Sequence, residues 1–157
     1  MSIKITNLKH SYNTSRHALN GVALSIEKGE FVAIIGETGS GKSTLVQHLN
    51  ALLIPNEGTV EVNDIVITKN KRKNKNISKL REKVGLVFQF PEYQLFDETV
   101  LKDVSFGLKN FGFKNKEAEE KAKEALNKVG IGESYYQRSP FELSGGERRR
   151  VAIAGIL

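Results

Sequence analysis

The chain has no cysteine among its 157 residues, and it has no long apolar run. The absence of cysteine excludes disulfides, thiolate metal ligands and cysteine nucleophiles, and it agrees with a reducing compartment. A membrane-spanning helix needs about 20 consecutive apolar residues. No segment of the sequence approaches that length. We therefore expect any membrane association to occur through a partner protein or at the membrane surface.

Basic residues outnumber acidic ones, which gives the chain a net charge of +6. They form two groups, Lys69, Lys71, Arg72, Lys73, Lys75, Lys79, Arg81 and Lys83, and then Arg148, Arg149 and Arg150. Such groups can bind nucleic acid or anionic lipid head groups. In the first group asparagines, not aromatic residues, separate the basic side chains, so no surface for base stacking is visible. A solvated loop over residues 69–76 is the simplest interpretation, and the role of the basic loop 69–75 stays open.

A glycine-rich motif directly after the apolar run Phe31–Ile35 is the strongest functional signal. It fits the P-loop pattern G-x-x-x-x-G-K-[ST] and consists of Gly36, Glu37, Thr38, Gly39, Ser40, Gly41, Lys42, Ser43 and Thr44. Glycines allow the loop to turn its backbone N–H groups toward one point, where they bind phosphate oxygens. The predicted helix 45–53 adds the positive end of its dipole. We expect Lys42 to contact the β- and γ-phosphates of a nucleoside triphosphate and the Ser43 hydroxyl to bind Mg²⁺.

The hydrophobic pattern predicts an α/β fold that begins with strands and ends with helices. Strands are expected over 3–12, 18–26, 31–35, 59–62, 65–68 and 84–88, and helices over 45–53, 77–82, 100–110 and 116–129. The continuous apolar runs 31–35 and 84–88 are typical of buried parallel strands. The turn Asn63-Asp64 joins the strands on either side of it into a hairpin.

The segment Leu143–Glu147 has the features of a second anion site. Ser144 and Glu147 have the spacing of a capping box, which predicts a helix that begins at Gly145. Gly145 and Gly146 each lower helix propensity by about 1 kcal/mol relative to alanine, so a well-capped helix alone does not explain them. A phosphate that approaches the serine hydroxyl and the uncovered amides would explain them.

The order of these motifs resembles the nucleotide-binding domain of ABC transporters. That family has a P-loop, then a glutamine after a core strand, then an LSGGQ or LSGGE signature. Here Gln89 follows the predicted strand 84–88, and residues 143–147 read LSGGE. The resemblance implies a P-loop ATPase that uses ATP and Mg²⁺. It assigns catalytic roles to Gln89 and Lys42 and metal binding to Ser43 and Gln89.

The same resemblance covers the whole chain. It implies an ABC ATPase core with an antiparallel β subdomain and a helical subdomain, divided as 1–90, 91–143 and a signature helix 144–157. Tyr12 lies where the family has an aromatic residue that stacks on adenine, and an ordinary strand aromatic is the alternative. In a head-to-tail dimer, Ser144, Gly145 and Gly146 would close over the ATP bound by the P-loop of the other subunit.

Two segments narrow the resemblance to the ATPase subunits of energy-coupling factor (ECF) transporters, especially the second of their two paralogous ATPases. They are 87–96, VFQFPEYQLF, and 139–155, SPFELSGGERRRVAIAG. Such proteins power the uptake of vitamins or transition-metal ions from the cytoplasmic side of the cell membrane, as peripheral subunits. The implied partners are a paralogous ATPase, a separate substrate-binding membrane subunit, and a membrane scaffold. The scaffold would dock on Pro91, Glu92, Tyr93, Leu95 and Phe96, although packing within the domain explains Leu95 and Phe96 equally well.

The chain departs from the family pattern because Leu157 precedes the region of the Walker B aspartate, the catalytic glutamate and the switch histidine. We therefore expect a fragment of a longer ATPase, which by itself binds ATP weakly at best and does not turn it over. The histidines His10, His17 and His48 are expected to be structural or at the surface.

Two other functions stay open. One is a catalytically inactive nucleotide-binding remnant, and the other is an ABC ATPase associated with nucleic acid. The interval between Gln89 and Leu143 favours neither repair nor chromosome ATPases, because those proteins insert long coiled coils there. We expect no nucleic-acid partner.

Overall fold

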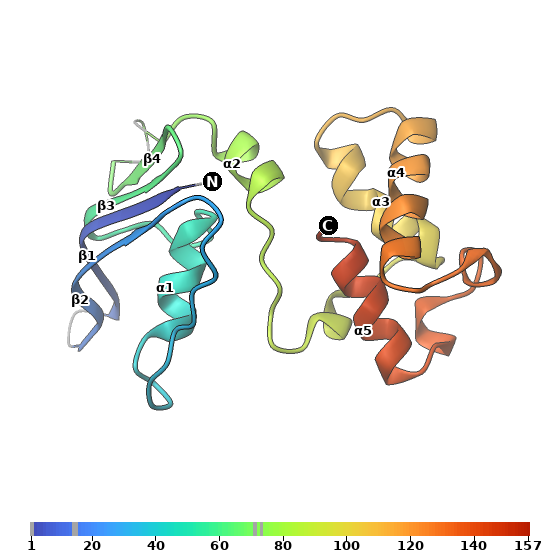
Figure 1. The fold of residues 1–157 in the computed structure, drawn as a ribbon, viewed down its shortest axis with the longest axis horizontal. Helices are drawn as coiled ribbons and strands as arrows, with labels where there is room; N and C mark the ends of the chain where they lie inside the picture. Colours follow the sequence, from blue (N-terminus) through green and yellow to red (C-terminus); the bar gives the residue numbers. More distant parts are fainter. Residues whose placement is uncertain (1, 14–15, 71, 73) are drawn as a thin grey trace. The chain divides into compact units, whose positions relative to one another are not determined.

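The computed structural model describes residues 2–13, 16–70, 72 and 74–157, and it divides the chain into two compact units (Figure 1). The first unit is Met1–Val84 and the second is Gly85–Leu157. Two residues of the basic loop, Lys71 and Lys73, lie outside the described residues. Its other basic side chains are exposed, as the interpretation of a solvated loop requires.

The first unit is built on a four-stranded antiparallel sheet with the strand order β2-β1-β3-β4. The strands are β1 (Ile3–Asn13), β2 (Arg16–Ile26), β3 (Glu57–Val62) and β4 (Ile65–Thr68). Strand β1 pairs with β2 on one side and with β3 on the other. The predicted antiparallel strands and the hairpin around Asn63-Asp64 are therefore confirmed.

A bulge in β1 changes which of its side chains face the core. Ile5 is buried before the bulge, whereas Leu8 and His10 are buried after it, so the alternation shifts by one residue. Asn7 lies in the shifted stretch with a φ of 47°. Gly58 of β3 lies against it, and a Cβ at Gly58 would overlap backbone carbonyl oxygens of β1. The bulge therefore requires a glycine on the neighbouring strand.

Two helices pack in the first unit. Helix α1 (Lys42–Leu49) contacts β2 and β3, and Figure 1 shows it beside the sheet. Helix α2 (Ile77–Lys83) is joined to the end of α1, because Arg81 donates to the carbonyl oxygens of Asn50 and Ala51 at 3.3 and 2.9 Å. The buried core of the unit consists of Ile3, Ile5, Leu8, Leu19, Leu45, Ala51, Val60, Val62, Ile67 and Leu80.

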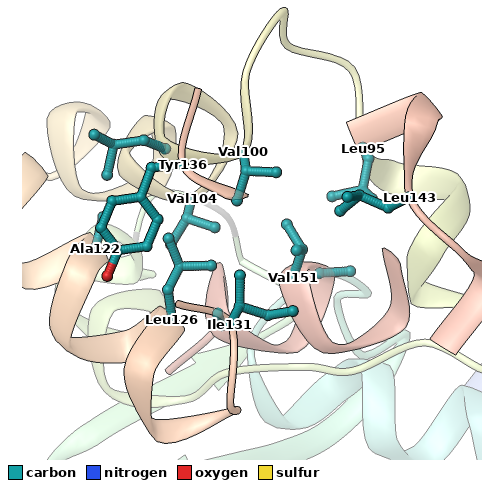
Figure 2. Packing of buried hydrophobic residues seen from close by; sticks show 12 residues of the cluster. Leu95, Val100, Val104, Ala122, Leu126, Ile131, Tyr136, Leu143 and Val151 are labelled. Carbon is teal, nitrogen blue, oxygen red and sulfur yellow. The ribbon is translucent and has the colours of Figure 1, made fainter. Parts of the chain in front are cut away.

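The second unit is helical. Its α-helices are α3 (Val100–Asn110), α4 (Asn115–Lys128) and α5 (Gly145–Ala154), and its 3-10 helices are η2 (Pro91–Gln94), η3 (Glu133–Tyr135) and η4 (Pro140–Glu142). Figure 2 shows apolar side chains such as Val104, Leu126 and Val151 meeting between the helices. All three are almost fully buried. The helices predicted over 100–110 and 116–129 are confirmed within one residue at each end.

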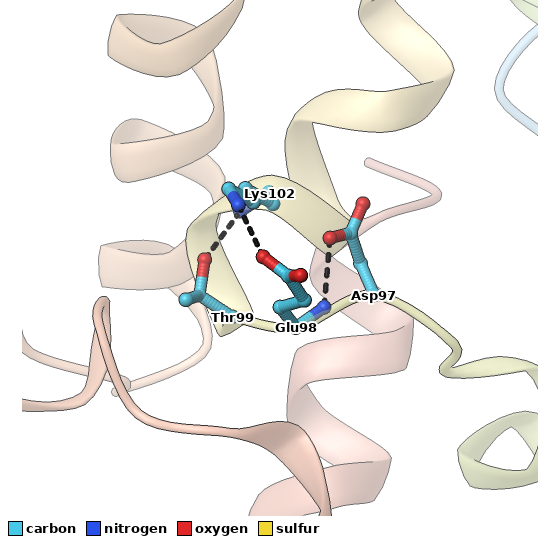
Figure 3. Close-up of polar contacts among 4 residues, drawn as sticks. All are labelled: Asp97, Glu98, Thr99 and Lys102. Carbon is cyan, nitrogen blue, oxygen red and sulfur yellow. Dashed lines mark hydrogen bonds and ion pairs between the residues drawn. The ribbon is translucent and has the colours of Figure 1, made fainter.

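The start of α3 is held by a set of short polar contacts (Figure 3). Thr99 is the N-cap, and its hydroxyl accepts from the backbone N–H of Lys102 at 3.3 Å. The Lys102 ammonium pairs with the Glu98 carboxylate at 2.6 Å. One carboxylate oxygen of Asp103 accepts from the backbone N–H groups of Phe96 and Asp97 at 2.8 Å each. These contacts fix the backbone that carries Phe96.

Two of the predicted strands were wrong. Residues 31–35 and 84–88 are not strands, and the side chains of Phe31 and Ile35 are 100% and 92% exposed. A parallel strand is stable when other strands pair with its edges and helices cover its faces. Within the described part of the chain, neither segment has a paired strand. An apolar run identifies a segment that could be buried, but it does not supply the partners.

The contact between β3 and the bulge gives a stability test. Gly58→Ala and Gly29→Ala both place a Cβ at a positive φ, 79° and 90°, which costs about 1–2 kcal/mol. At Gly29 no described atom lies within 4 Å of the new Cβ, whereas at Gly58 backbone oxygens obstruct it. We expect Gly58→Ala to lose about 1–3 kcal/mol more than Gly29→Ala in urea unfolding. Equal losses would show that the close approach is unimportant.

Candidate functional site

The glycine-rich loop ends in a tight contact with the sheet. Gly39 and Gly41 have φ values of 82° and 92°, in the left-handed region that glycine adopts without strain. A Cβ at Gly41 would lie 2.5 Å from the carbonyl oxygen of Ala18 on β2. Gly41 is also the N-cap of α1, and its carbonyl accepts from the N–H of Leu45 at 2.8 Å. The absence of a side chain at this position lets the helix begin directly against β2.

One cavity gathers most of the predicted nucleotide-binding residues of the first unit. It has a volume of about 390 Å³ and is lined by Tyr12, Asn13, His17, Ala18, Gly39, Gly41, Lys42, Ser43 and Thr44. The lining comes from β1, β2, the loop and α1, so the antiparallel pairing of β1 with β2 brings Tyr12 to the loop. Sequence reasoning missed Asn13, His17 and Ala18, which only the register of the β1/β2 hairpin could have placed there.

Lys42 folds back over the loop. Its ammonium donates to the carbonyl oxygens of Gly36 and Glu37 at 2.9 and 2.7 Å. The loop thus turns two carbonyl groups toward the lysine. The positive charge of Lys42, the first N–H groups of α1 and the flexible glycine backbone together make a site suited to phosphate oxygens.

Tyr12 is placed beside the start of α1. Its hydroxyl lies 3.1 Å from the Thr44 hydroxyl oxygen, and its side chain remains 66% exposed. An exposed aromatic ring at the edge of a polar cavity can stack on a planar ligand group, while the bond to Thr44 restricts how the ring turns.

The second unit carries the signature segment, where the predicted capping box is present. The Glu147 carboxylate accepts from the Ser144 hydroxyl at 2.7 Å and from the Ser144 backbone N–H at 2.8 Å. A Cβ at Gly145 would meet no described atom within 4 Å, and one at Gly146 would meet only the Arg150 guanidinium, at 3.9 Å. Packing within this unit therefore does not explain the two glycines.

The remaining predicted residues also belong to the second unit. Gln89 is exposed. Pro91 and Leu95 are buried, and Leu95 belongs to the hydrophobic core, which agrees with the alternative that it packs within the domain. A docking role for these two residues stays a prediction. Tyr93 and Phe96 are 82% and 58% exposed. They remain available to a partner, because the apolar core of this unit is formed by other side chains.

Glu92 has an unusual environment for a carboxylate. Its Oε2 atom is buried and has no hydrogen-bond partner among the described residues. The Nε atom of Arg148 on α5 is in the same situation. Buried polar atoms in proteins are normally paired, so a further polar group would be favourable beside each of these atoms.

Comparison with known proteins gives a consistent result. Residues 19–157 match the family model described as "ABC transporter". The chain is 61% identical over 142 residues to the energy-coupling factor transporter ATP-binding protein EcfA2 of Bacillus subtilis, covering 90% of this chain and 51% of that protein. It is 56% identical to the EcfA2 of Streptococcus sanguinis, covering 100% of this chain and 57% of that protein. The chain thus spans about half the length of these relatives.

Solved structures show the same similarity. The cbiO1 protein of Clostridium perfringens, described as part of the ABC transporter complex cbiONQ, superimposes with a TM-score of 0.80 at 39% identity. That match covers 99% of this chain and 60% of cbiO1. The ATP-binding cassette MJ0796, described as a dimer in a post-hydrolysis state with ADP and Pi, has a TM-score of 0.83 at 33% identity. That match covers 99% of this chain and 68% of the MJ0796 chain.

The capping box gives a test by titration. Hydrogen bonds from the Ser144 hydroxyl and backbone, and then from the Tyr135 hydroxyl, lower the pKa of Glu147 from 4.5 to about 2. The cap's contribution to stability is therefore fully present above about pH 4.5 and is lost as the pH falls through about 2. We expect carboxyl ¹³C NMR to show this low pKa. Ser144→Ala should raise it toward 4.5, and Tyr135→Phe should raise it less. An ordinary pKa in the unmodified chain would contradict the arrangement.

Proposed function

The chain belongs to the ABC transporter family, and on that premise we propose that it is the nucleotide-binding part of an ATPase subunit of an energy-coupling factor importer. The observation that carries the proposal is the single cavity that joins Tyr12 to the glycine-rich loop and the first residues of α1. The similarity to EcfA2 proteins over nearly the whole chain supports the choice of importer class.

In the proposed binding mode, ATP lies with its adenine on the ring of Tyr12 and its phosphates in the loop. The residues that contact phosphates are Gly36, Glu37, Thr38, Gly39, Ser40, Gly41, Lys42, Ser43 and Thr44, mainly through backbone N–H groups. Lys42 exchanges the carbonyl oxygens of Gly36 and Glu37 for the β- and γ-phosphates. Binding therefore replaces contacts within the loop by charge-assisted ones.

Mg²⁺ fits this site as a companion of the nucleotide. The Ser43 hydroxyl is a hard oxygen donor of the kind that Mg²⁺ prefers. Within the part of the chain that the structure describes, no group of three or more His, Asp or Glu side chains could hold a metal ion. The family resemblance is the reason for which we propose Ser43 and Gln89 as ligands beside the phosphates, and when bound the ion would neutralise phosphate charge.

In the complete protein we propose that ATP is hydrolysed and that transport depends on it. Gln89 would sense the nucleotide and orient the attacking water, and Lys42 would stabilise the negative charge of the transferring phosphate. Residues 144–146 of one subunit would cover the ATP of a paralogous subunit, where Ser144 and the two uncovered glycine amides face a phosphate. Closure of such a dimer on ATP would drive the transport step.

The proposed contact with the membrane scaffold involves Glu92, Tyr93 and Phe96. Two of these side chains are exposed aromatic residues, and the partly exposed Glu92 supplies a carboxylate for a basic group of the scaffold. None of the described helices has the length and apolar character needed to span a bilayer. On the similarity to ECF transporter ATPases, the proposed location is peripheral, on the cytoplasmic side of the cell membrane, with a vitamin or a transition-metal ion recognised by a separate membrane subunit.

Binding of ATP to the chain tests the phosphate site. NMR titration with Mg²⁺-ATP should move the amide signals of residues 36–44, and Lys42→Ala should weaken the affinity about tenfold or more because the ammonium is lost. Lys28→Ala is the matched control, since Lys28 is an exposed lysine in a turn of the same unit, and it should leave the affinity unchanged. Equal affinities of the three proteins would sink the proposed binding mode.

The base site has a separate test. Stacking on an aromatic ring contributes about 1–3 kcal/mol, so Tyr12→Ala should weaken ATP binding about 5- to 150-fold, whereas Tyr12→Phe should keep most of it. Inorganic tripolyphosphate has no base, so its affinity should be the same for all three proteins. A loss of tripolyphosphate binding in Tyr12→Ala would instead show that Tyr12 supports the loop.

A further inference from the structure

Two of the three histidines form a buried pair behind the cavity. His48 on α1 is fully buried and His10 on β1 is 7% exposed. The Nε2 atom of His48 lies 3.2 Å from the Nδ1 atom of His10, and the rings meet edge to face with centroids 4.7 Å apart. Two buried imidazoles in hydrogen-bond contact are sensitive to protonation, because an added proton turns an accepting nitrogen into a donor and places a charge in a buried site.

The surrounding carbonyl groups decide where the protons are. The Nδ1 atom of His48 lies 2.7 Å from the Thr44 carbonyl oxygen, which only accepts, so this nitrogen is protonated. In a neutral ring the Nε2 atom of His48 then accepts, and His10 Nδ1 must donate to it. The same His10 atom lies 3.3 Å from the Ile54 carbonyl oxygen, another acceptor. With His48 neutral, these contacts therefore place the proton of each ring on Nδ1.

This pair is part of a closed set of contacts that includes the nucleotide site. His10 lies edge to face with Tyr12, with centroids 4.9 Å apart, and the Tyr12 hydroxyl meets Thr44 at 3.1 Å. Thr44 in turn accepts from His48. Contacts among four residues, one of them through the Thr44 backbone carbonyl, thus connect β1 to α1. Tyr12 and Thr44 also line the cavity, so each histidine contacts a residue of the cavity wall.

Protonation of His48 opposes this arrangement. A proton on Nε2 would point at the proton of His10 Nδ1, and the charge would lie in a buried place. Burial lowers the pKa of His48 below 6.5, and repulsion from His10, once that ring is charged, lowers it further, whereas hydrogen bonds to the Thr44 and Ile54 carbonyl groups partly offset the effect. As the pH falls below about 6.5, the unfolded chain takes up this proton more readily than the folded one, so the folded pair becomes less stable.

Other ionisable groups near the pair face elsewhere or have their own partners. On β1, Lys9 alternates with His10 across the sheet and pairs with Glu57 of β3 at 2.8 Å. On β2, His17 contacts the Ser11 hydroxyl oxygen at 2.8 Å. On α1, Lys42 is bonded to loop carbonyl groups. Tyr12 is the remaining titratable group, through its ring contact with His10.

We propose that His10 and His48 are positioning residues of the nucleotide site, that their contact aligns Tyr12 with the first turn of α1, and that protonation of His48 weakens nucleotide binding. The inference rests on the proposed function for its ligand, but the state of the pair is independent of any ligand. In mildly acidic conditions the nucleotide affinity would therefore fall by more than protonation of the ATP phosphates alone would cause.

Long-range ¹H–¹⁵N NMR of the imidazole rings tests the pair without nucleotide. At pH 7.5 we expect His10 and His48 of the 157-residue chain to be in the Nδ1–H form, in contrast to the Nε2–H form that is usual for free histidine. An Nε2–H form of either ring overturns the proposal, whatever the chain binds.

Nucleotide affinity tests the positioning role. For the unmodified chain, we expect the Mg²⁺-ATP affinity to fall at least about fivefold more between pH 7.5 and 5.5 than for His48→Leu, which fills similar space and does not titrate. Both proteins meet the same ligand, so the titration of ATP cancels in the comparison. At pH 7.5, His10→Asn, whose amide can still donate to His48 and Ile54, should bind more tightly than His10→Ala.

The outcomes separate the two proposals. If the unmodified chain binds no ATP at either pH, the proposed function fails, and the imidazole spectra still decide whether the pair exists. If it binds ATP with the same pH profile as His48→Leu, the function stands and the positioning role is overturned.

Discussion

The site depends on which side chains of strand β1 face the core. Side chains of a strand alternate between its two faces, so an inserted residue moves every later side chain to the other face. The bulge at Asn7 performs this shift between Ile5 and Leu8. Without it, Lys9 would lie on the inner face in place of His10. The position of Gly58 on the neighbouring strand makes the bulge possible, and the cavity follows from it.

The elements that depend only on residues close together in the chain were predicted from the sequence. The limits of α3 and the capping box of α5 depend on residues within one or two turns, and both agree with the structure. The glycine-rich loop and its helix were also predictable, although α1 ends at Leu49 instead of continuing to 53, because Ala51 takes a φ of 56°. Each of these features is encoded by residues close together in the chain.

Features that depend on distant partners could not be predicted. The apolar runs 31–35 and 84–88 have the composition of buried strands, but pairing requires neighbours, and sequence periodicity says nothing about their presence. The role of Leu95 was left open for the same reason, because a leucine fits a docking surface and a hydrophobic core equally well. The histidine pair joins residues 38 positions apart, and neither residue has a local pattern that distinguishes it from a surface histidine.

The bonds of Lys42 to the Gly36 and Glu37 carbonyl groups bear on the thermodynamics of ligand capture. The ammonium holds the glycine-rich loop in its folded conformation before a ligand binds, so the backbone loses little conformational entropy on binding. Lys42 must leave these carbonyl groups before it can contact the phosphates. The enthalpy gained from the phosphate contacts is therefore reduced by the enthalpy of the contacts that are lost. Binding at such a loop is therefore expected to have a modest enthalpy and a small entropic penalty, the signature of a preorganised receptor.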